Sequence, residues 1–556
     1  CKGTKDMLIV NKNLKSHNAS VELKVALKRI TELDLPSQSD PQILLYLQNP
    51  LGNDWLRHAH CQTGRIENEP NFSFILDYCF GELQKIKFVA VNSDKSLKLE
   101  PQDSAWNEQY HIGEFVTDIG SILGKSKGIL KGNLVLTERP EKDPYQIIIV
   151  GRELTPKNGK TLNLKIQCRN LQLPKLAVGA DVFYKLSSKI QKNPDTPSEM
   201  KVLYESERCY SKNPDWPVTK LSEGDLQNGG SNEEISFTCW QHKRGNHKCI
   251  GECIIKIDNL LSSENVGSQQ ISLSPKGELL LQCAFENTFL DYIAGGLEIK
   301  LNIAIDFTSS NRQYVHGIDL HNISWDETSY QHVIRLVGSV MKSYDTNGQI
   351  PIYGFGGKFY GSGNVSHNFP LNQNDQQPEV MGISGVLEIY RDTLSNVILS
   401  SPANFTPAIT SVVNRLQRLV NSNVNVYEVL IIITYGLIDD MESTIKAVMN
   451  ASVLPLSIVI IGLGNADFTN LNTLANDFMS FNWDDLKPRD IVNFVTMKDF
   501  ESQDRIDRNL PKAVLNKIPS QIMDYMLRRG ITPRKQKRSE TLDNLFAENR
   551  PLPDSI

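Results

Sequence analysis

The sequence predicts two all-β sandwich domains followed by an α/β domain with a doubly wound parallel sheet. The first half of the chain consists of short β-branched or aromatic runs separated by turn-rich segments, a pattern typical of β-sandwiches. These runs form two similar series, and each carries a late Ile-Gly pair, Ile112-Gly113 and Ile250-Gly251. From about residue 296 onward, apolar strand-length runs alternate with helix-length segments, which indicates a parallel sheet.

The strand-length runs of the first half separate into two groups along the chain. The runs of the first group span 20–30, 42–49, 72–78 and 84–91. The runs of the second group span 162–168, 181–188, 236–240, 252–257 and 278–285. Because the two groups look like divergent copies of one unit, we expect one complete sandwich from each.

The second half contains apolar runs that we expect to be strands buried on both faces. They span 297–307, 351–357, 427–436, 454–464 and 490–495, and helix-length segments span 331–344 and 442–452. Ligands of doubly wound sheets bind at the carboxyl ends of the strands. The first of these strands ends at Asp306 and is followed by Thr308 and Ser310, whose side-chain oxygens suit such a site.

These patterns also predict the domain boundaries. We expect an N-terminal leader, a first sandwich, a second sandwich, a linker, an α/β domain and a tail that is first basic and then acidic. Their ranges are 1–19, 20–155, 160–287, 288–298, 299–525 and 526–556. The tail begins with a cluster of Arg and Lys and ends in an acidic-apolar segment, which we interpret as solvated chain.

The composition of the 556 residues excludes several classes of protein. A content of 40% hydrophobic and 22% charged residues is typical of globular protein, and a net charge of -5 excludes a uniformly basic nucleic-acid binder. No apolar run approaches the roughly 18 residues of a membrane span. The nine cysteines, irregularly spaced between Cys1 and Cys283, indicate reduced thiols in the cytoplasm.

Several motifs resemble the copine family in sequence and in order. The segment FLDYIAGGLEIKLNIAIDFTSSN at 289–311 carries the closest resemblance, which extends over residues 20–533. The other motifs are GFGGKF, VSHNFPLN, LPLSIVIIGLGNADF, RDIVNFV and IPSQIMDYM. The resemblance implies two C2 domains followed by a von Willebrand A-type domain.

The resemblance also implies a calcium site in the first C2 domain, where Asp carboxylates from two loops hold the ion. Asp34 and Asp40 are present in the first loop. In the third loop Asn92 replaces one carboxylate and Asp94 is retained. The sequence therefore leaves two alternatives, a weak calcium site or turn residues that hold no ion.

In the second C2 domain the implied calcium site has lost most of its ligands. Asp181 is kept, but Lys175, Gln241 and Lys243 stand at other ligand positions. A cation in the site repels the ion, so we expect no calcium there. The loop HKRGNHK is either a basic tip for anionic phospholipid or a solvated loop. The lipid-binding candidates are Lys175, Lys243, Arg244 and Lys248.

The same loop contains Cys239, His242, His247 and Cys249, which raises the alternative of a zinc site. Their spacing matches none of the familiar structural zinc patterns. Cys239 and Cys249 also fall on predicted strands. We therefore favour two buried thiols and two loop histidines.

The A-type domain of the family implies a third metal site, which combines an Asp-x-Ser/Thr-x-Ser loop with a Thr and an Asp from two further loops. Asp306, Thr308 and Ser310 fit the first loop. Ala403 stands at the position of the Thr, and Tyr435 stands at the position of the Asp. One carboxylate and two hydroxyls make a poor octahedral cage, so we expect this degenerate site to be empty of magnesium.

We predict a non-enzymatic, copine-like protein that binds acidic phospholipid, scaffolds a protein partner through its A-type domain and has a weakened or lost dependence on calcium. We expect it in the cytoplasm, peripherally on membranes, or in a cytoskeletal or other large assembly. The alternative is a purely structural interaction protein whose C2 domains contact protein rather than lipid. No nucleophile elbow, Walker loop, kinase motif set or zinc-hydrolase motif indicates an enzyme, and we expect no nucleic-acid partner.

Overall fold

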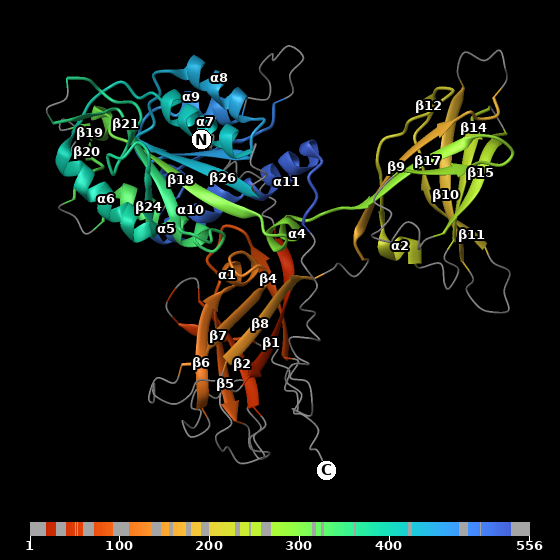
Figure 1. Cartoon of the computed structure of the whole chain (residues 1–556), viewed down its shortest axis with the longest axis horizontal. Coiled ribbons are helices and arrows are strands. Elements are labelled where there is room, and N and C mark those ends of the chain that lie inside the picture. Colours follow the sequence, from red (N-terminus) through yellow and green to blue (C-terminus); the bar gives the residue numbers. More distant parts are fainter. Residues whose placement is uncertain are drawn as a thin grey trace, which may run out of the picture. The chain divides into compact units, whose positions relative to one another are not determined.

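The protein was analysed as a computed structural model. It describes residues 18–28, 41–49, 52, 54–58, 72–92, 111–135, 146–154, 159–173, 180–190, 199–227, 234–243, 246–256, 268–313, 318–323, 327–360, 363–420, 425–476, 488–500 and 502–534. The contacts divide the chain into two compact units (Figure 1). Residues 1–153 and 288–556 form one unit, and residues 154–287 form the other.

The first unit contains a β-sandwich, here called the first sandwich, made of two four-stranded antiparallel sheets. One sheet has the order β4 (Phe72–Cys79), β1 (Asn18–Lys28), β8 (Gln146–Glu153), β7 (Ile129–Asn133). The other sheet has the order β3 (Trp55–Arg57), β2 (Pro41–Gln48), β5 (Lys85–Asn92), β6 (His111–Asp118).

The strands of the first sandwich alternate between buried and less buried side chains. Val21, Leu23 and Val25 of β1 are fully buried between the sheets, because alternate side chains of a strand point to the same face. A short helix, α1 (Ile119–Leu123), follows β6. It begins at Asp118, whose carboxylate accepts the backbone N–H of Ser121 and caps the helix.

The second unit is another antiparallel β-sandwich, here called the second sandwich. One sheet has the order β11 (Glu199–Glu205), β10 (Asp181–Ile190), β14 (Glu234–Gln241), β15 (Lys248–Lys256), with β12 (Cys209–Tyr210) also paired to β10. The other has the order β13 (Thr219–Ser222), β9 (Thr161–Arg169), β17 (Glu278–Phe285), β16 (Ser268–Ser272), and α2 (Glu223–Gln227) follows β13.

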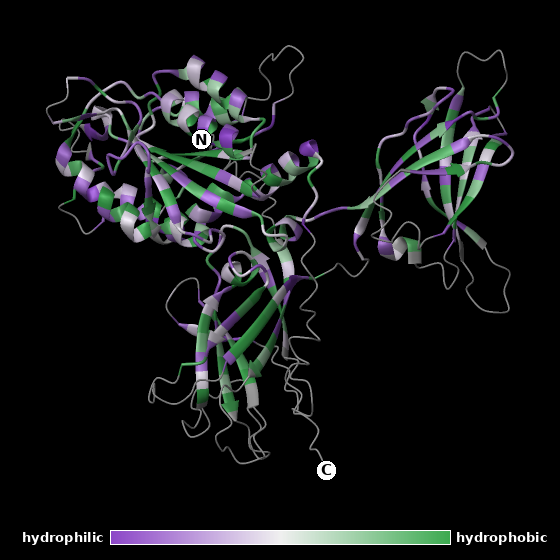
Figure 2. Cartoon of the chain, in the orientation of Figure 1, coloured by the Kyte–Doolittle hydropathy of each residue, from purple (hydrophilic) through white to green (hydrophobic). Residues whose placement is uncertain are grey.

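The first unit also contains an α/β domain built on a seven-stranded sheet. Its order is β23 (Phe369–Pro370), β21 (Gln349–Phe355), β18 (Glu298–Asp306), β26 (Val426–Thr434), β27 (Leu456–Gly462), β28 (Val492–Thr496), with β24 (Glu379–Met381) also paired to β21. The pairs from β21 to β28 are parallel, as the sequence predicts. These strands are strongly apolar (Figure 2).

Helices cover both faces of this sheet (Figure 1). Alternate residues of one strand join different cores: Ile431 of β26 packs with α5, α6, α10 and α11, whereas Ile432 packs with α7, α8 and α9. This arrangement explains why β26 and β27 are apolar at almost every position. The helices are α4 (Phe289–Ala294), α5 (Ser329–Met341), α6 (Gly382–Asn396), α7 (Thr406–Val420), α8 (Met441–Ala451), α9 (Thr469–Asn476), α10 (Gln503–Leu515) and α11 (Ile518–Arg529).

Short elements complete the α/β domain. They are η2 (Ser309–Asn311), β19 (Arg312–Gln313), β20 (Ile318–Asp319), β22 (Gly357–Phe359), β25 (Val397–Leu399) and η5 (Met497–Asp499). Helix α11 continues to Arg529, so it includes residues 526–529, which the sequence analysis assigns to the tail. In the part of the chain that the structure describes, no helix has both the length and the apolar character of a membrane span.

Candidate functional site

The carboxyl end of β18 holds the buried carboxylate of Asp306. Its Oδ1 accepts the backbone N–H of Thr308 at 2.7 Å. Its Oδ2 accepts the hydroxyl of Thr434 at 2.7 Å and the backbone N–H of Tyr435 at 3.2 Å. Both carboxylate oxygens therefore have donors from the protein itself, and two of these donors come from the end of the neighbouring strand β26.

The two hydroxyls predicted as ligands lie together in the turn that follows β18. The hydroxyl oxygens of Thr308 and Ser310 are 2.6 Å apart and share a hydrogen bond. The amide of Asn311 donates to the carbonyl oxygens of Asp306 and Thr308, each at 3.1 Å, and so holds the turn in place. The structure thus brings Asp306, Thr308 and Ser310 together.

Ala403 lies in the loop after β25, at the position where the family resemblance implies a Thr ligand. It is buried, and its backbone N–H donates to the carboxylate of Asp439 at 2.6 Å. The next acidic residue, Asp440, accepts the backbone N–H groups of Phe405 and Thr406 at the start of α7, each at 2.9 Å. These two carboxylates therefore hold the loop and cap α7, because the first N–H groups of a helix have no partner within it.

Tyr435 lies in the loop after β26, where the family resemblance implies an Asp ligand. Its backbone N–H contacts Asp306, while its ring packs against Gly464 in the loop after β27. A Cβ atom at Gly464 would lie 2.3 Å from Cδ2 of this ring, so the contact needs glycine. The phenol ring occupies space between two loops and supplies no negative charge.

Burial raises the pKa of Asp306 above its usual range, although the hydrogen bonds from Thr308, Thr434 and Tyr435 oppose the shift. Within the described residues, no three His, Cys, Asp or Glu side chains are grouped closely enough to hold a metal ion. At this end of the sheet the side chains offer one carboxylate, already engaged by three donors, and several hydroxyls. These side chains can donate and accept hydrogen bonds.

A buried aromatic cluster contacts the backbone carbonyl of Asp306, and the sequence did not predict it. The ring of His321 lies between Phe307 and Tyr330, with centroid distances of 5.3 and 4.4 Å. Its Nε2 lies 2.9 Å from the carbonyl oxygen of Asp306, and its Nδ1 lies 2.7 Å from the hydroxyl of Tyr390. A carbonyl oxygen only accepts, so Nε2 carries the proton and Nδ1 accepts from Tyr390.

Burial lowers the pKa of His321 to about 3, so the ring is neutral at pH 7. The Tyr330 hydroxyl lies 2.7 Å from Oδ1 of Asn311 and 3.2 Å from the carbonyl oxygen of Asp306, and its single proton is available to these two acceptors. No spacing in the sequence connects residues 321, 330 and 390 with Asp306. The only sequence signal is the histidine that follows the hydroxyl-rich loop.

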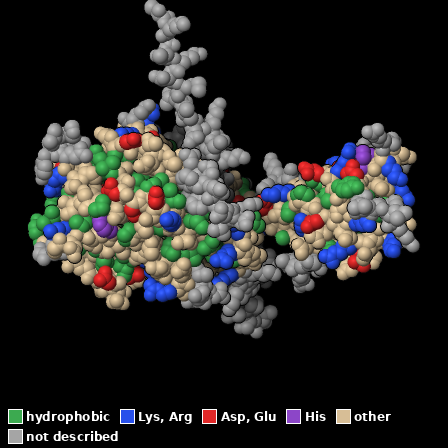
Figure 3. Space-filling model, turned by 90° about the horizontal axis from the view of Figure 1, so that it is seen from above, with side chains coloured by type: hydrophobic (Ala, Val, Ile, Leu, Met, Phe, Trp, Pro, Cys, Tyr) green, Lys and Arg blue, Asp and Glu red, His purple; other side chains and the backbone are tan. Residues whose placement is uncertain are grey.

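The predicted lipid-binding residues lie at one end of the second sandwich. Lys243 and Lys248 are both exposed there. Strand pairing places Asp181 opposite Tyr210, and Val182 opposite Gln241, at this same end. Lys and Arg side chains are numerous on the surface of this unit in Figure 3. The other two candidates, Lys175 and Arg244, lie outside the described residues.

Two further residues at this end were not predicted from the sequence. Tyr210 is 74% exposed, the largest exposed aromatic side chain of the second sandwich among the residues described. Arg208 lies 3.8 Å from the retained carboxylate of Asp181. We name Lys243, Lys248, Arg208 and Tyr210 together the basic tip.

The zinc alternative of the sequence analysis involves the same loop. Cys239 is fully buried in the core of the second sandwich, where its thiol contacts Cys168. The rings of His242 and His247 lie against each other with centroids 4.8 Å apart. Cys239 thus faces the core and the two histidines lie in the turn, as favoured from the sequence, whereas Cys249 is only partly buried, unlike the second buried thiol that was expected.

Most of the calcium candidates of the first sandwich lie outside the described residues, namely Asp34, Asp40 and Asp94. Asn92 is the last residue of β5, and its backbone pairs with Pro41 at the start of β2. This pairing brings the ends of the two candidate loops to one end of the sandwich. It leaves the calcium site itself as an expectation.

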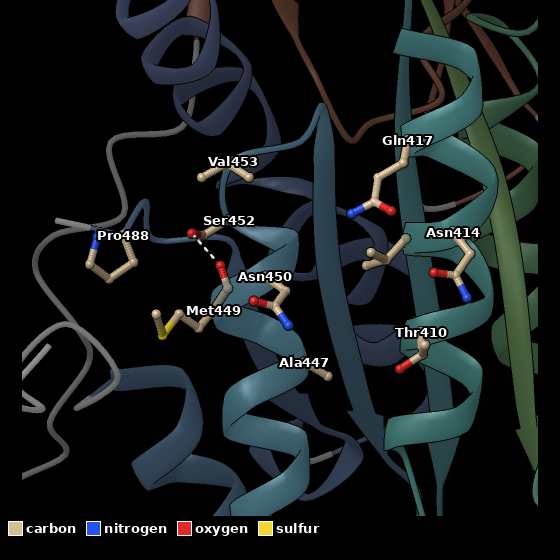
Figure 4. Close-up of a pocket in the computed structure, with 10 residues that line it drawn as sticks. Thr410, Asn414, Gln417, Ala447, Met449, Asn450, Ser452, Val453 and Pro488 are labelled. Carbon is tan, nitrogen blue, oxygen red and sulfur yellow. Dashed lines mark hydrogen bonds between the residues drawn. The ribbon is translucent and has the colours of Figure 1, made fainter. Parts of the chain in front are cut away.

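The α/β domain also has a cavity of about 410 Å³ between α7 and α8 (Figure 4). Amide side chains from both helices, Asn414, Gln417 and Asn450, point toward it over an apolar floor that includes Val413 and Ala447. None of the described residues that line it carries a charge. The cavity therefore offers no acid, base or metal ligand.

The fold and the site define a chain of two β-sandwiches and an α/β domain whose first strand ends in a carboxylate and two hydroxyls. A family model described as Copine matches residues 319–534. Copine-D of Dictyostelium discoideum is 30% identical over 546 residues, covering 94% of this chain and 98% of that protein. The chain belongs to the copine family, which confirms the resemblance of its motifs.

Two further comparisons give similar proteins. Nicotinic receptor-associated protein 1 of Caenorhabditis briggsae is 28% identical over 608 residues, covering 96% of this chain and 92% of that protein. A calcium-bound pair of C2 domains from Extended-Synaptotagmin 2 covers 48% of this chain and 96% of that chain, with 14% identity and a TM-score of 0.18. A score this low supports no argument about the site.

Proposed function

We propose that this copine-family protein is a non-enzymatic scaffold that attaches to acidic phospholipid surfaces and holds a protein partner through its von Willebrand A-type domain. Attachment takes place through the basic tip of the second C2 domain and depends weakly or not at all on calcium. The observation that carries this proposal is the basic tip, where cations occupy positions that the family resemblance assigns to calcium ligands.

Exposed cations near an anionic membrane each contribute about 1 kcal/mol. Lys243, Lys248 and Arg208 are part of one end of the second C2 domain, and Tyr210 adds an exposed aromatic ring suited to the headgroup region. The Asp181 carboxylate, which lies 3.8 Å from Arg208, is the counter-charge at this end. The combination supports electrostatic attachment without a bridging ion.

The A-type domain is proposed to bind its partner without a metal. Asp306 already has three internal donors, and Asp439 and Asp440 hold the loop and helix α7. The accessible groups near Asp306 are hydroxyls: the Oγ atoms of Ser309 and Ser401 lie 2.9 Å apart on exposed turns. Such a surface would bind a partner through hydrogen bonds rather than through a shared cation.

The weak calcium site of the first C2 domain, made of Asp34, Asp40, Asn92 and Asp94, remains part of the proposal. Three carboxylates and an amide remain, and water and lipid phosphate would complete the six to eight oxygens that calcium takes. We expect this site to increase lipid binding only at high calcium.

The test is sedimentation of the purified full chain with phosphatidylserine vesicles, in calcium and in chelator, at low and moderate salt. We expect binding that persists in chelator, falls with salt and falls further in Lys243→Glu. The matched control is Lys201→Glu, which reverses an exposed charge on β11 near the opposite end of the same sheet, where Lys201 pairs with Ser188. Equal losses from the two variants would argue against the basic tip.

Calcium dependence is tested in the same assay with the pair Asp34→Asn and Asp40→Asn. Binding that requires calcium and disappears in this double variant would replace the proposal with a calcium-triggered first C2 domain.

A second candidate function is a structural interaction protein whose C2 domains contact protein only. The name of the similar Nicotinic receptor-associated protein 1 describes an association with a receptor, which favours this alternative. Absence of vesicle binding under every condition, with an intact fold, would support it.

A further inference from the structure

The first sandwich and the α/β domain share one continuous hydrophobic core. Phe80, in the turn after β4, packs against Phe289 of α4 and Tyr344 after α5, with ring centroids 5.1 and 4.9 Å apart. All three rings are buried. Interfaces between independently moving domains are usually more polar, so this junction has the character of an interior.

Buried polar groups at the junction are paired across it. The hydroxyls of Tyr78 and Tyr344 lie 2.5 Å apart, and burial raises the pKa of both phenols above the usual range. A hydroxyl pair in an apolar interior costs free energy if either partner leaves. Separation of the two domains would therefore expose the apolar rings and break this bond.

Main-chain and charged contacts surround the core of the junction. The backbone N–H of Lys125 donates to the carbonyl oxygen of Ser343 at 2.8 Å, and the Ser343 hydroxyl donates to Asp118 at 2.9 Å. Lys512 of α10 pairs with Glu82 at 2.6 Å. Gly124 permits the close approach, because a Cβ atom there would lie 2.4 Å from the Ser343 oxygen.

The chain enters and leaves the second sandwich at two points that lie next to each other. Glu153 is the last residue of β8, and Thr288 caps α4. The Thr288 hydroxyl donates to the Glu153 carboxylate at 2.5 Å, although the two residues are separated by the whole second sandwich. This bond holds together the two ends of the segment 154–287, which forms its own compact unit.

We infer that the first sandwich and the α/β domain form one rigid, cooperatively folded body, and that the second sandwich is carried on this body as an inserted module. The first sandwich is then a fixed arm of the α/β domain rather than a free membrane-targeting module.

The arm has a defined length. Strand β5 runs eight residues from Lys85, beside the junction, to Asn92 at the loop end. At about 3.3 Å per residue, the seven steps from Lys85 to Asn92 place the loop end about 23 Å from the junction. If the loop end binds lipid, the arm fixes the distance of the α/β domain from the membrane, and this consequence alone rests on the proposed function.

The test is hydrogen exchange of the full chain, read peptide by peptide by mass spectrometry at increasing urea. We expect peptides of β4 and β8 to lose protection at the same urea concentration as peptides of β26 and β27. Peptides of the second sandwich should lose protection at a midpoint of their own. Because no lipid or partner is present, the result does not depend on the proposed function.

Two independent domains could have equal urea midpoints by chance, and variants distinguish that case from a single cooperative body. Phe80→Ala should lower the midpoints of the first sandwich and the α/β domain together, and the milder Tyr78→Phe should do the same to a smaller extent. Phe237→Leu, in the core of the second sandwich, should lower only the midpoint of that sandwich. The inference is overturned if the first sandwich opens while β26 and β27 stay protected, or if Phe80→Ala leaves the α/β midpoint unchanged.

Discussion

The hydroxyl of Thr434 donates to the carboxylate of Asp306 across two neighbouring strands, with 2.7 Å between Oγ1 and Oδ2. The backbone N–H of Tyr435 donates to the same oxygen at 3.2 Å. The end of β26 thus satisfies the carboxylate at the end of β18. A carboxylate satisfied by the protein has less to gain from an ion, because each donor must be given up or shared when the ion binds.

This arrangement predicts the response of the chain to magnesium. Adding magnesium should leave the melting temperature of the wild-type protein unchanged, whereas the double variant Ala403→Thr with Tyr435→Asp should be stabilised. The variant supplies a second carboxylate and a third hydroxyl near Asp306, which approaches the oxygen set that magnesium requires. Thermal unfolding with and without magnesium tests both the wild-type protein and the double variant.

The matched control is Tyr435→Phe, which removes the phenol hydroxyl without adding a ligand and should remain insensitive to magnesium. A wild-type melting temperature that rises with magnesium would show that Asp306, Thr308 and Ser310 suffice to bind the ion.

His321 predicts a pH dependence of stability. Burial lowers its folded pKa to about 3 from an ordinary value of 6.5, so between these values the unfolded chain binds the additional proton. Stability is therefore fully present above pH 6.5 and falls by about 1.4 kcal/mol per pH unit as the pH drops below it. In His321→Gln this contribution should be absent.

The measurement is the urea-unfolding free energy of the body that contains the α/β domain, at pH 7.5, 6.5 and 5.5. The free-energy difference between wild type and His321→Gln should shrink as the pH falls. Glutamine can still donate to the Asp306 carbonyl oxygen, so the readout is the slope with pH rather than the loss at one pH. Parallel profiles for the two chains would contradict a buried neutral His321.

Replacement of Arg489 should greatly lower the stability of the protein. It is buried, and its guanidinium donates to the carbonyl oxygens of Ser452 at 2.9 Å, Gln521 at 2.8 Å and Leu454 at 2.6 Å. Arg489→Met removes the charged donor from these three buried carbonyl oxygens, and each such hydrogen bond contributes about 1.5–3 kcal/mol. We expect the unfolding free energy of the body that contains the α/β domain to fall by about 3 kcal/mol or more.

The control for Arg489→Met is Arg528→Met, which removes a surface guanidinium that pairs with Asp524 at 2.9 Å one helical turn away. Such pairs contribute about 0.3–0.5 kcal/mol. Similar losses from both variants would mean that the carbonyl contacts of Arg489 contribute little.

The exposed ring of Tyr210 should make a contribution to vesicle affinity that salt does not screen. Tyr210→Ser should weaken binding to phosphatidylserine vesicles about fivefold at moderate salt, where cations are screened and about 1 kcal/mol of aromatic burial matters most. Its melting temperature should not change, because the ring is exposed. Vesicle sedimentation at two salt concentrations checks the effect.

Tyr360→Ser is the matched control, because Tyr360 is 68% exposed but belongs to the α/β domain. It should bind vesicles as the wild type does. Equal weakening by both changes would point to a nonspecific effect of losing a surface tyrosine.

Local patterns in the sequence were enough to predict the strands and part of the candidate site. The apolar runs around Ile431 and Ile432 predicted a sheet buried on both faces, because side-chain alternation and hydrophobicity act over a few residues. Asp306, Thr308 and Ser310 come together for the same reason, since they occupy one turn. That Ala403 and Tyr435 replace metal ligands follows from the family resemblance and stays a prediction.

The partners of these residues were decided only by the tertiary structure. Thr434 and His321 reach Asp306 because parallel strands end at one edge and the polar turns fold over it. The same is true of Tyr78 and Tyr344, which are 266 residues apart and meet at the junction of two domains. Such contacts depend on which apolar faces cover each other, and no local periodicity encodes that choice. The sequence by itself determined the succession of strands along the chain and the turn that holds Asp306, Thr308 and Ser310, whereas packing decided which groups satisfy the Asp306 carboxylate.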